Sequence, residues 1–271
     1  MKGIWMIQKE HVTPDVVIFY CHGGGFSMGS SYFYLEYLLA LLTSLHELGF
    51  SNPAIFALEY TLVPLATYPT QLNETLAGYA YCLEKAPSPD KICVAGDSAG
   101  GTLVLSLLLY LSRQADGSPR AAIPGMALLL SPWFSLTSPL NQNTRSDYLD
   151  ANTLHVYAHQ YAGQGGAEIT DPLISPGKCK DLAWWRRAAP REGFVVLAGS
   201  EEVFANECES LAGVLRKAGV EVEARVEDGG IHCWPVVGMF LGQKGGRLRG
   251  VRDCAMSVWD RLGRGRMVNG V

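Results

Sequence analysis

The chain has 271 residues, of which 48% are hydrophobic and 18% are charged, and its net charge is -4. These values are typical of a soluble globular chain that is long enough for one large α/β domain. No basic block is present, which argues against a nucleic-acid partner, and the most apolar run, 103–111, is too short to span a bilayer.

Apolar stretches alternate with leucine-rich or amphipathic stretches along the chain, which predicts a mostly parallel sheet with helices on both faces. No internal repeat or linker interrupts this pattern, so residues 1–271 are expected to form one domain. Strands are predicted at 16–20, 54–60, 91–95, 126–130, 194–197 and 220–226, and helices at 31–48, 71–85, 102–111, 153–161, 207–218 and 252–262.

The first predicted strand runs directly into His22-Gly23-Gly24-Gly25. Three consecutive glycines offer closely spaced backbone N–H groups without side chains in the way, as an oxyanion site requires. A flexible glycine loop is the alternative. A phosphate cradle is a weaker one, because no Lys-Ser/Thr pair follows the glycines.

The strand predicted at 91–95 and the helix predicted at 102–111 flank the motif Gly96-Asp97-Ser98-Ala99-Gly100-Gly101. A strand, a G-x-S-x-G turn and a helix form a nucleophile elbow, in which a strained backbone lifts the serine hydroxyl clear of the sheet. Ser98 is therefore the predicted nucleophile. The backbone N–H of Ala99 is the natural third donor to an oxyanion, and a chance match in a glycine-rich chain is the alternative.

A serine nucleophile needs a base and a carboxylate, and in α/β-hydrolases these follow the serine in the order acid, then histidine. His232 follows the last predicted strand in a loop rich in glycine, and a buried structural histidine is the alternative. Glu201 and Glu202 follow the strand at 194–197, and both qualify as the acid. His22 is expected to support its loop, and the pair His155 and His159 is interpreted as surface residues rather than metal ligands.

The chain resembles the hormone-sensitive-lipase-like branch of the α/β-hydrolase fold esterases and lipases, which carries an HGGG loop and a GDSAG elbow. The resemblance implies that Ser98 is the nucleophile, His232 the base, and Gly24, Gly25 and Ala99 the oxyanion donors. Family members with G-S-x-E are similar to 199–202, which implies Glu202 as the acid, although the commoner family acid is Asp. Further similar segments are 59–64, 131–133, 147–149, 171–173 and 230–232.

The chain departs from this family before the HGGG motif. Members usually have two more strands and a pair of cap helices there, whereas about fifteen residues precede the first predicted strand here. We therefore expect either a truncated sequence or an open acyl site. Part of a lid is expected from about 135–166. Trp184 and Trp185 form either a membrane-facing or substrate-facing surface or a buried structural pair.

The sequence thus predicts a serine carboxylic-ester hydrolase acting on small to medium acyl esters, with short acyl groups preferred. Amide or peptide hydrolysis with the same residues is an alternative, and a non-catalytic binding homologue is another. Seven cysteines without CxxC spacing and no signal peptide favour reduced thiols and a cytoplasmic location. We predict no metal and no cofactor. Membrane association is not indicated, and the oligomeric state is left open.

Overall fold

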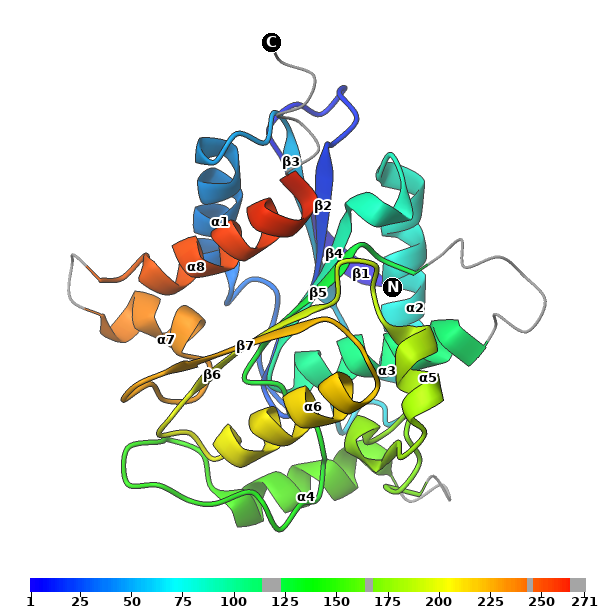
Figure 1. Ribbon diagram of the computed structural model, residues 1–271, viewed down its shortest axis with the longest axis vertical. Coiled ribbons are helices and arrows are strands. Elements are labelled where there is room, and N and C mark those ends of the chain that lie inside the picture. The colour runs from blue at the N-terminus through cyan, green and yellow to red at the C-terminus, as the bar shows by residue number, and fades with distance from the viewer. Residues whose placement is uncertain (114–122, 164–167, 243–245, 264–271) are drawn as a thin grey trace.

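A computed structural model describes residues 1–113, 123–163, 168–242 and 246–263 of the protein. One seven-stranded sheet runs through the molecule in the order β1-β3-β2-β4-β5-β6-β7 (Figure 1). Strand β1 pairs with β3 in antiparallel orientation, and the remaining neighbours are parallel. The strands are β1 (Lys2–Ile7), β2 (Val16–Cys21), β3 (Pro53–Glu59), β4 (Ile92–Asp97), β5 (Met126–Leu130), β6 (Phe194–Gly199) and β7 (Val222–Glu227).

The central strands are buried on both faces, which explains their continuous apolar sequences. All six residues of β2 are buried. Because successive side chains of a strand point to opposite faces, Val16, Ile18 and Tyr20 join one apolar cluster, and Val17 and Phe19 join the other. The molecule therefore has two cores, one on each side of the sheet.

Helices cover both faces of the sheet, as the alternating sequence pattern predicts. The helices α1, α7 and α8 pack over one face, and α2, α3, α5 and α6 pack over the other (Figure 1). Within the described part of the chain, no helix has the length and apolar character that crossing a membrane requires. The helices are α1 (Leu35–Glu47), α2 (Thr70–Lys85), α3 (Ala99–Arg113), α4 (Ala151–Ala162), α5 (Leu182–Ala188), α6 (Ala205–Lys217), α7 (Trp234–Leu241) and α8 (Arg249–Val258), with short helical turns at Pro89–Lys91, Pro176–Lys178 and Trp259–Gly263.

All predicted strands and helices are present, with ends shifted by a few residues. The sequence patterns missed three elements: the edge strand β1 and the short helices α5 and α7. Strand β1 is fixed by its pairing with β3 rather than by a strong pattern of its own. Trp185 lies fully buried within α5, which is the structural role that was one of the two interpretations of the pair, while Trp184 is half-buried and its Nε1 donates to Leu109 O at 3.0 Å.

The parallel strands place their C-terminal ends at one edge of the sheet, which is where α/β proteins bind ligands. The loops after β2, β4, β5, β6 and β7 therefore converge there. These loops contain the glycine motif, Ser98, Glu202 and His232. The topology alone thus brings together residues that lie far apart in the sequence.

Candidate active site

Ser98 lies at a sharp turn between β4 and α3. Its backbone has φ of +51°, in the left-handed region that a non-glycine residue adopts only at an energetic cost. Two hydrogen bonds hold this turn: Ser98 N donates to Leu130 O at 3.0 Å, and Trp133 N donates to Ser98 O at 3.0 Å. A Cβ atom at Gly100 would lie 2.0 Å from Cys21 O, so glycine is required for α3 to approach the sheet.

Asp97 connects the elbow to the glycine loop. Its Oδ1 accepts hydrogen bonds from Gly23 N at 2.9 Å and from the Tyr20 hydroxyl at 2.8 Å, and its Oδ2 accepts one from the Tyr34 hydroxyl at 2.7 Å. Burial raises the pKa of the Asp97 carboxyl, and these donors act in the opposite direction. Because Asp97 directly precedes Ser98, the glycine loop and the nucleophile are held in one frame.

The three predicted oxyanion donors lie around this frame. Gly24 and Gly25 line a cavity together with Ser98, and they have φ values of +111° and +58°. A Cβ atom on Gly24 would lie 2.1 Å from Met28 O, so a side chain there would distort the loop. Ala99 is the first residue of α3, and an N–H group in the first turn of a helix has no partner within that helix.

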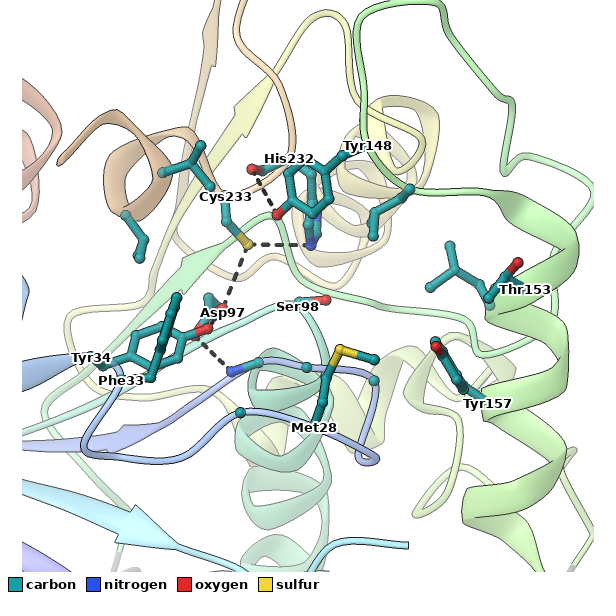
Figure 2. Close-up of a pocket in the computed structure, with 18 of the residues that line it drawn as sticks. Met28, Phe33, Tyr34, Asp97, Ser98, Tyr148, Thr153, Tyr157, His232 and Cys233 are labelled. Atoms are coloured by element: carbon teal, nitrogen blue, oxygen red, sulfur yellow. Dashed lines mark hydrogen bonds between the residues drawn. The ribbon is translucent and has the colours of Figure 1, made fainter. Parts of the chain in front are cut away.

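His232 is buried in the loop between β7 and α7. Figure 2 shows its ring and the Ser98 hydroxyl facing the same cavity. The Nε2 atom lies 3.3 Å from Cys233 Sγ, and Nδ1 is buried without a hydrogen-bond partner among the described residues. Burial lowers the pKa of the His232 imidazole to about 3, so the ring is neutral at neutral pH and one of its nitrogens is unprotonated, as a general base requires.

The two candidate acids lie in very different surroundings. Glu202 is buried, and its Oε2 accepts hydrogen bonds from Ser131 Oγ at 2.6 Å and from Gly199 N at 2.8 Å. Burial raises the pKa of the Glu202 carboxyl to about 7. Glu201 is exposed, and its Oε2 accepts a 3.3 Å hydrogen bond from Ser146 Oγ.

Ser131 and Asp147 tie the Glu202 loop to the His232 loop. Ser131 Oγ donates to Glu202 and accepts a 2.9 Å hydrogen bond from Cys233 N. Asp147 accepts from His232 N at 3.2 Å and from Val203 N at 2.8 Å. The Glu202 carboxylate therefore bonds to Ser131 in this structure, while Nδ1 of His232, the atom that the acid of a triad must reach, has no partner in the described part of the chain.

The sequence patterns assign no role to Ser131 or Asp147, although both lie in segments that resemble the family. Ser131 follows β5 with a left-handed φ of +45°, and such a backbone angle cannot be read from the sequence. His22 was expected to support its loop, and its ring stacks on Tyr60 at 4.3 Å while Nδ1 bonds to Gly23 O.

Among the described residues, no cluster of three or more His, Cys, Asp or Glu could hold a metal ion.

A cavity of about 610 Å³ lies in front of Ser98, a size that suits a small-molecule ligand. Figure 2 shows Phe33 and Tyr34 on one side of Ser98, and Thr153 and Tyr157 of α4 on the other. The described residues that line the cavity include two carboxylates, Asp97 and Asp150, and no lysine or arginine. The cavity is thus largely apolar, with its polar groups gathered near Ser98 and along α4.

A mostly parallel sheet, a strained serine between β4 and α3, and a histidine after the last strand together define an α/β-hydrolase. Residues 18–236 match the family model described as alpha/beta hydrolase fold, and the chain belongs to this family. The resemblance to the hormone-sensitive-lipase-like branch is confirmed by the structural neighbours. The chain matches the crystal structure of the HSL-homolog EstE7 from a metagenome library with a TM-score of 0.77 at 25% identity, covering 96% of this chain and 86% of that one.

A second crystal structure, of a hormone-sensitive lipase from a metagenome library, matches with a TM-score of 0.77 at 28% identity, covering 95% of this chain and 82% of that one. Among curated proteins, the chain is 30% identical to the putative steryl acetyl hydrolase mug81 of Schizosaccharomyces pombe, over 88% of this chain and 64% of that protein. It is 29% identical to an acetyl-hydrolase of Streptomyces hygroscopicus, over 80% of this chain and 67% of that protein. The chain therefore spans about two thirds of the length of these curated relatives.

Proposed function

We propose that this protein hydrolyses carboxylic esters with short acyl groups, using Ser98 as the nucleophile. The observation that carries the proposal is the strained serine at the start of α3, facing one cavity together with His232 and the glycine loop. Relatives that are named acetyl-hydrolases and a relative that is named an esterase support the reaction type and a small acyl group.

In the proposed reaction, Ser98 Oγ attacks the ester carbonyl carbon while its proton passes to Nε2 of His232. The negative charge that develops on the carbonyl oxygen accepts hydrogen bonds from the N–H groups of Gly24, Gly25 and Ala99. Collapse of the tetrahedral intermediate breaks the bond to the alcohol, which leaves with the proton held by His232. Water then attacks the acyl-Ser98 ester by the same steps, releasing the acid and restoring the serine.

Glu202 is proposed to orient His232 and to stabilise the imidazolium, and this role requires its carboxylate to reach Nδ1 during turnover. Its burial and its place next to the histidine loop support Glu202 over the exposed Glu201. Likewise, Nε2 must exchange its contact with Cys233 for one with Ser98. Catalytic hydrogen bonds are often long or poorly aligned before substrate binds, so the proposal places both exchanges in the substrate complex.

We also propose that the segment from residue 135 to α4 forms part of a lid within a single domain. Leu149, Leu154 and Tyr157 from this segment line the cavity, which supports a covering role. Residues 164–166 of the expected lid lie outside the described residues. A lid has to present polar residues to solvent and apolar side chains to the cavity in front of Ser98.

The direct test is hydrolysis of p-nitrophenyl acetate by Ser98→Ala. We expect a loss of about 10⁴-fold or more in kcat with an unchanged circular dichroism spectrum. The matched control is Ser106→Ala, because Ser106 is a buried serine of the same helix α3 and does not line the cavity. A folded Ser98→Ala protein with near wild-type turnover would contradict the assignment of Ser98 as the nucleophile, whereas a folded wild-type protein without turnover would favour a non-catalytic binding protein.

A further inference from the structure

The cavity opens to the surface through an apolar rim that core packing does not explain. Phe33 precedes α1 and Phe240 lies in α7, yet their rings stack with centroids 5.5 Å apart and planes inclined by 26°. Phe33 is 62% exposed and Phe240 is 49% exposed, and both line the cavity. Exposed aromatic area costs free energy, and the two rings are not covered by other parts of the described chain.

Met28 adds a further apolar side chain to the cavity wall. It is 50% exposed, lines the cavity, and follows the glycine loop, and its side chain lies near Ser98 in Figure 2. A methionine adapts its unbranched side chain to the shape of a ligand and makes favourable contacts with ring edges. The two stacked phenylalanines offer flat ring faces to a ligand, while the Met28 side chain can change its rotamer to fit the ligand.

Charge restricts the ligand further. Asp150 lines the side of the cavity formed by α4, and hydrogen bonds from Thr153 N, Asn143 and the Thr153 hydroxyl lower the pKa of its carboxyl, so it is ionised at neutral pH. No lysine or arginine stands among the described lining residues to balance it. A substrate that carries a carboxylate or phosphate would meet repulsion without a partner for its charge.

We propose that the substrate is an uncharged ester whose alcohol carries a flat apolar ring system, and that this ring system lies against Phe33, Phe240 and Met28. The assignment to the alcohol rests on the proposed function, because a short acyl group bound next to Ser98 does not extend to the rim. Stacked rings prefer offset contacts with other flat rings, so an aromatic or fused-ring group gains more at this rim than a small alkyl group.

The experiment compares kcat/KM for 2-naphthylmethyl acetate and for ethyl acetate, which release alcohols of similar type but differ in the ring. We expect the wild-type protein to favour the naphthyl ester by roughly tenfold or more. The variant F33A/F240A should lose most of this preference, chiefly through a higher KM for the naphthyl ester, because the rim is remote from the reacting atoms.

The matched control is Tyr32→Ala. Tyr32 neighbours Phe33 in sequence and is 67% exposed, but it does not line the cavity, so its variant should keep the wild-type preference. A third ester with a carboxylate on the naphthyl ring should be hydrolysed at least roughly tenfold less efficiently than its neutral counterpart.

Equal kcat/KM values for the ring and ethyl esters, or an unchanged preference in F33A/F240A, would overturn this assignment, as would efficient hydrolysis of the carboxylate ester. Each of those results leaves the esterase proposal standing. Failure of that proposal is recognised separately, by hydrolysis of ethyl acetate that survives Ser98→Ala.

Discussion

The nucleophile region and the acid–base region of the site are built in different ways. The elbow around Ser98 is fixed by backbone hydrogen bonds and by glycines that approach other backbone atoms within 3 Å of where a Cβ would stand. The loops that carry Glu202 and His232 are also joined by a backbone hydrogen bond, from Glu201 N to Gly230 O at 2.9 Å, but Glu202 and His232 themselves are held by the side chains of Ser131 and Asp147. Close packing of backbone atoms therefore keeps the elbow rigid. The region of Glu202 and His232 depends on side chains that can change their hydrogen-bond partner or their charge.

This difference has a consequence for catalysis. The hydrogen bonds that hold the turn at Ser98 join backbone atoms, which do not titrate. Glu202 and His232 are both buried, and burial favours the neutral form of each side chain. It raises the pKa of Glu202 to about 7 and lowers the pKa of His232 to about 3. The charge that the proposed reaction needs on Glu202 is thus available only above roughly neutral pH.

Among changes that probe the difference between the two regions, the largest expected effect comes from Glu202→Gln, which keeps the side-chain volume but removes the charge that would stabilise the imidazolium. We expect kcat/KM for p-nitrophenyl acetate to fall by about 10³-fold, in line with the loss of a triad acid. Glu201→Gln is the matched control and should lose less than about twofold. If the two variants lose equal activity, or if Glu201→Gln loses more, the acid must be reassigned.

The steric region is broken most directly by Gly100→Ala. The added Cβ would lie 2.0 Å from Cys21 O, so either α3 or β2 must shift, and we expect the free energy of unfolding to fall by about 3 kcal/mol or more. Gly213→Ala in α6 is the control, because no described atom lies within 4 Å of a Cβ there. That change should stabilise the protein by up to about 1 kcal/mol. Urea unfolding of both variants measures the contrast, and equal stabilities would refute the steric explanation.

A pH series probes the polar region. Burial raises the pKa of Glu202 to about 7 in the folded protein, whereas an ordinary glutamate carboxyl has a pKa of 4.5, so the folded state retains a proton that the unfolded state releases. The contribution of this group to stability is therefore complete below pH 4.5 and is lost as the pH rises through 7.

Glu202→Gln should consequently be more stable than the wild type at about pH 8, by up to about 3 kcal/mol, and no more stable at about pH 4. Denaturant unfolding at the two pH values tests this, with Glu201→Gln as a control that shows no such change between them. If Glu202→Gln is less stable than the wild type at the higher pH, the hydrogen bonds to the buried carboxylate outweigh the cost of burying its charge, which would contradict the prediction.

The smallest expected effect comes from Tyr34→Phe, which removes one of the three hydrogen bonds that Asp97 accepts from Tyr20, Gly23 and Tyr34. Because Tyr20 and Gly23 continue to hold the carboxylate, we expect unfolding to become easier by about 1 kcal/mol and kcat/KM to fall only a few-fold. Tyr32→Phe, at an exposed position, should change neither quantity. A loss of activity as large as that of Glu202→Gln would mean that Asp97 does more than hold the loop.

The same division explains what the sequence could predict. The elbow and the glycine loop are short motifs whose geometry is local, so Ser98, Gly24 and Gly25 are found at the same cavity, as the motifs indicate. Ser131 and Asp147 act through partners that lie 56 to 102 positions away, and no local pattern reports such contacts. The stacking of Phe33 on Phe240 is equally long-range, and α7, which carries Phe240, was not predicted at all.

The central claim, that Ser98 is a nucleophile activated by His232, is tested most directly by mass spectrometry after treatment with a fluorophosphonate. We predict one adduct per chain, on the peptide that contains Ser98, and a labelling rate reduced by at least about 10³-fold in His232→Gln. Labelling of a different residue, or a His232→Gln protein that is labelled as fast as the wild type, would contradict this claim.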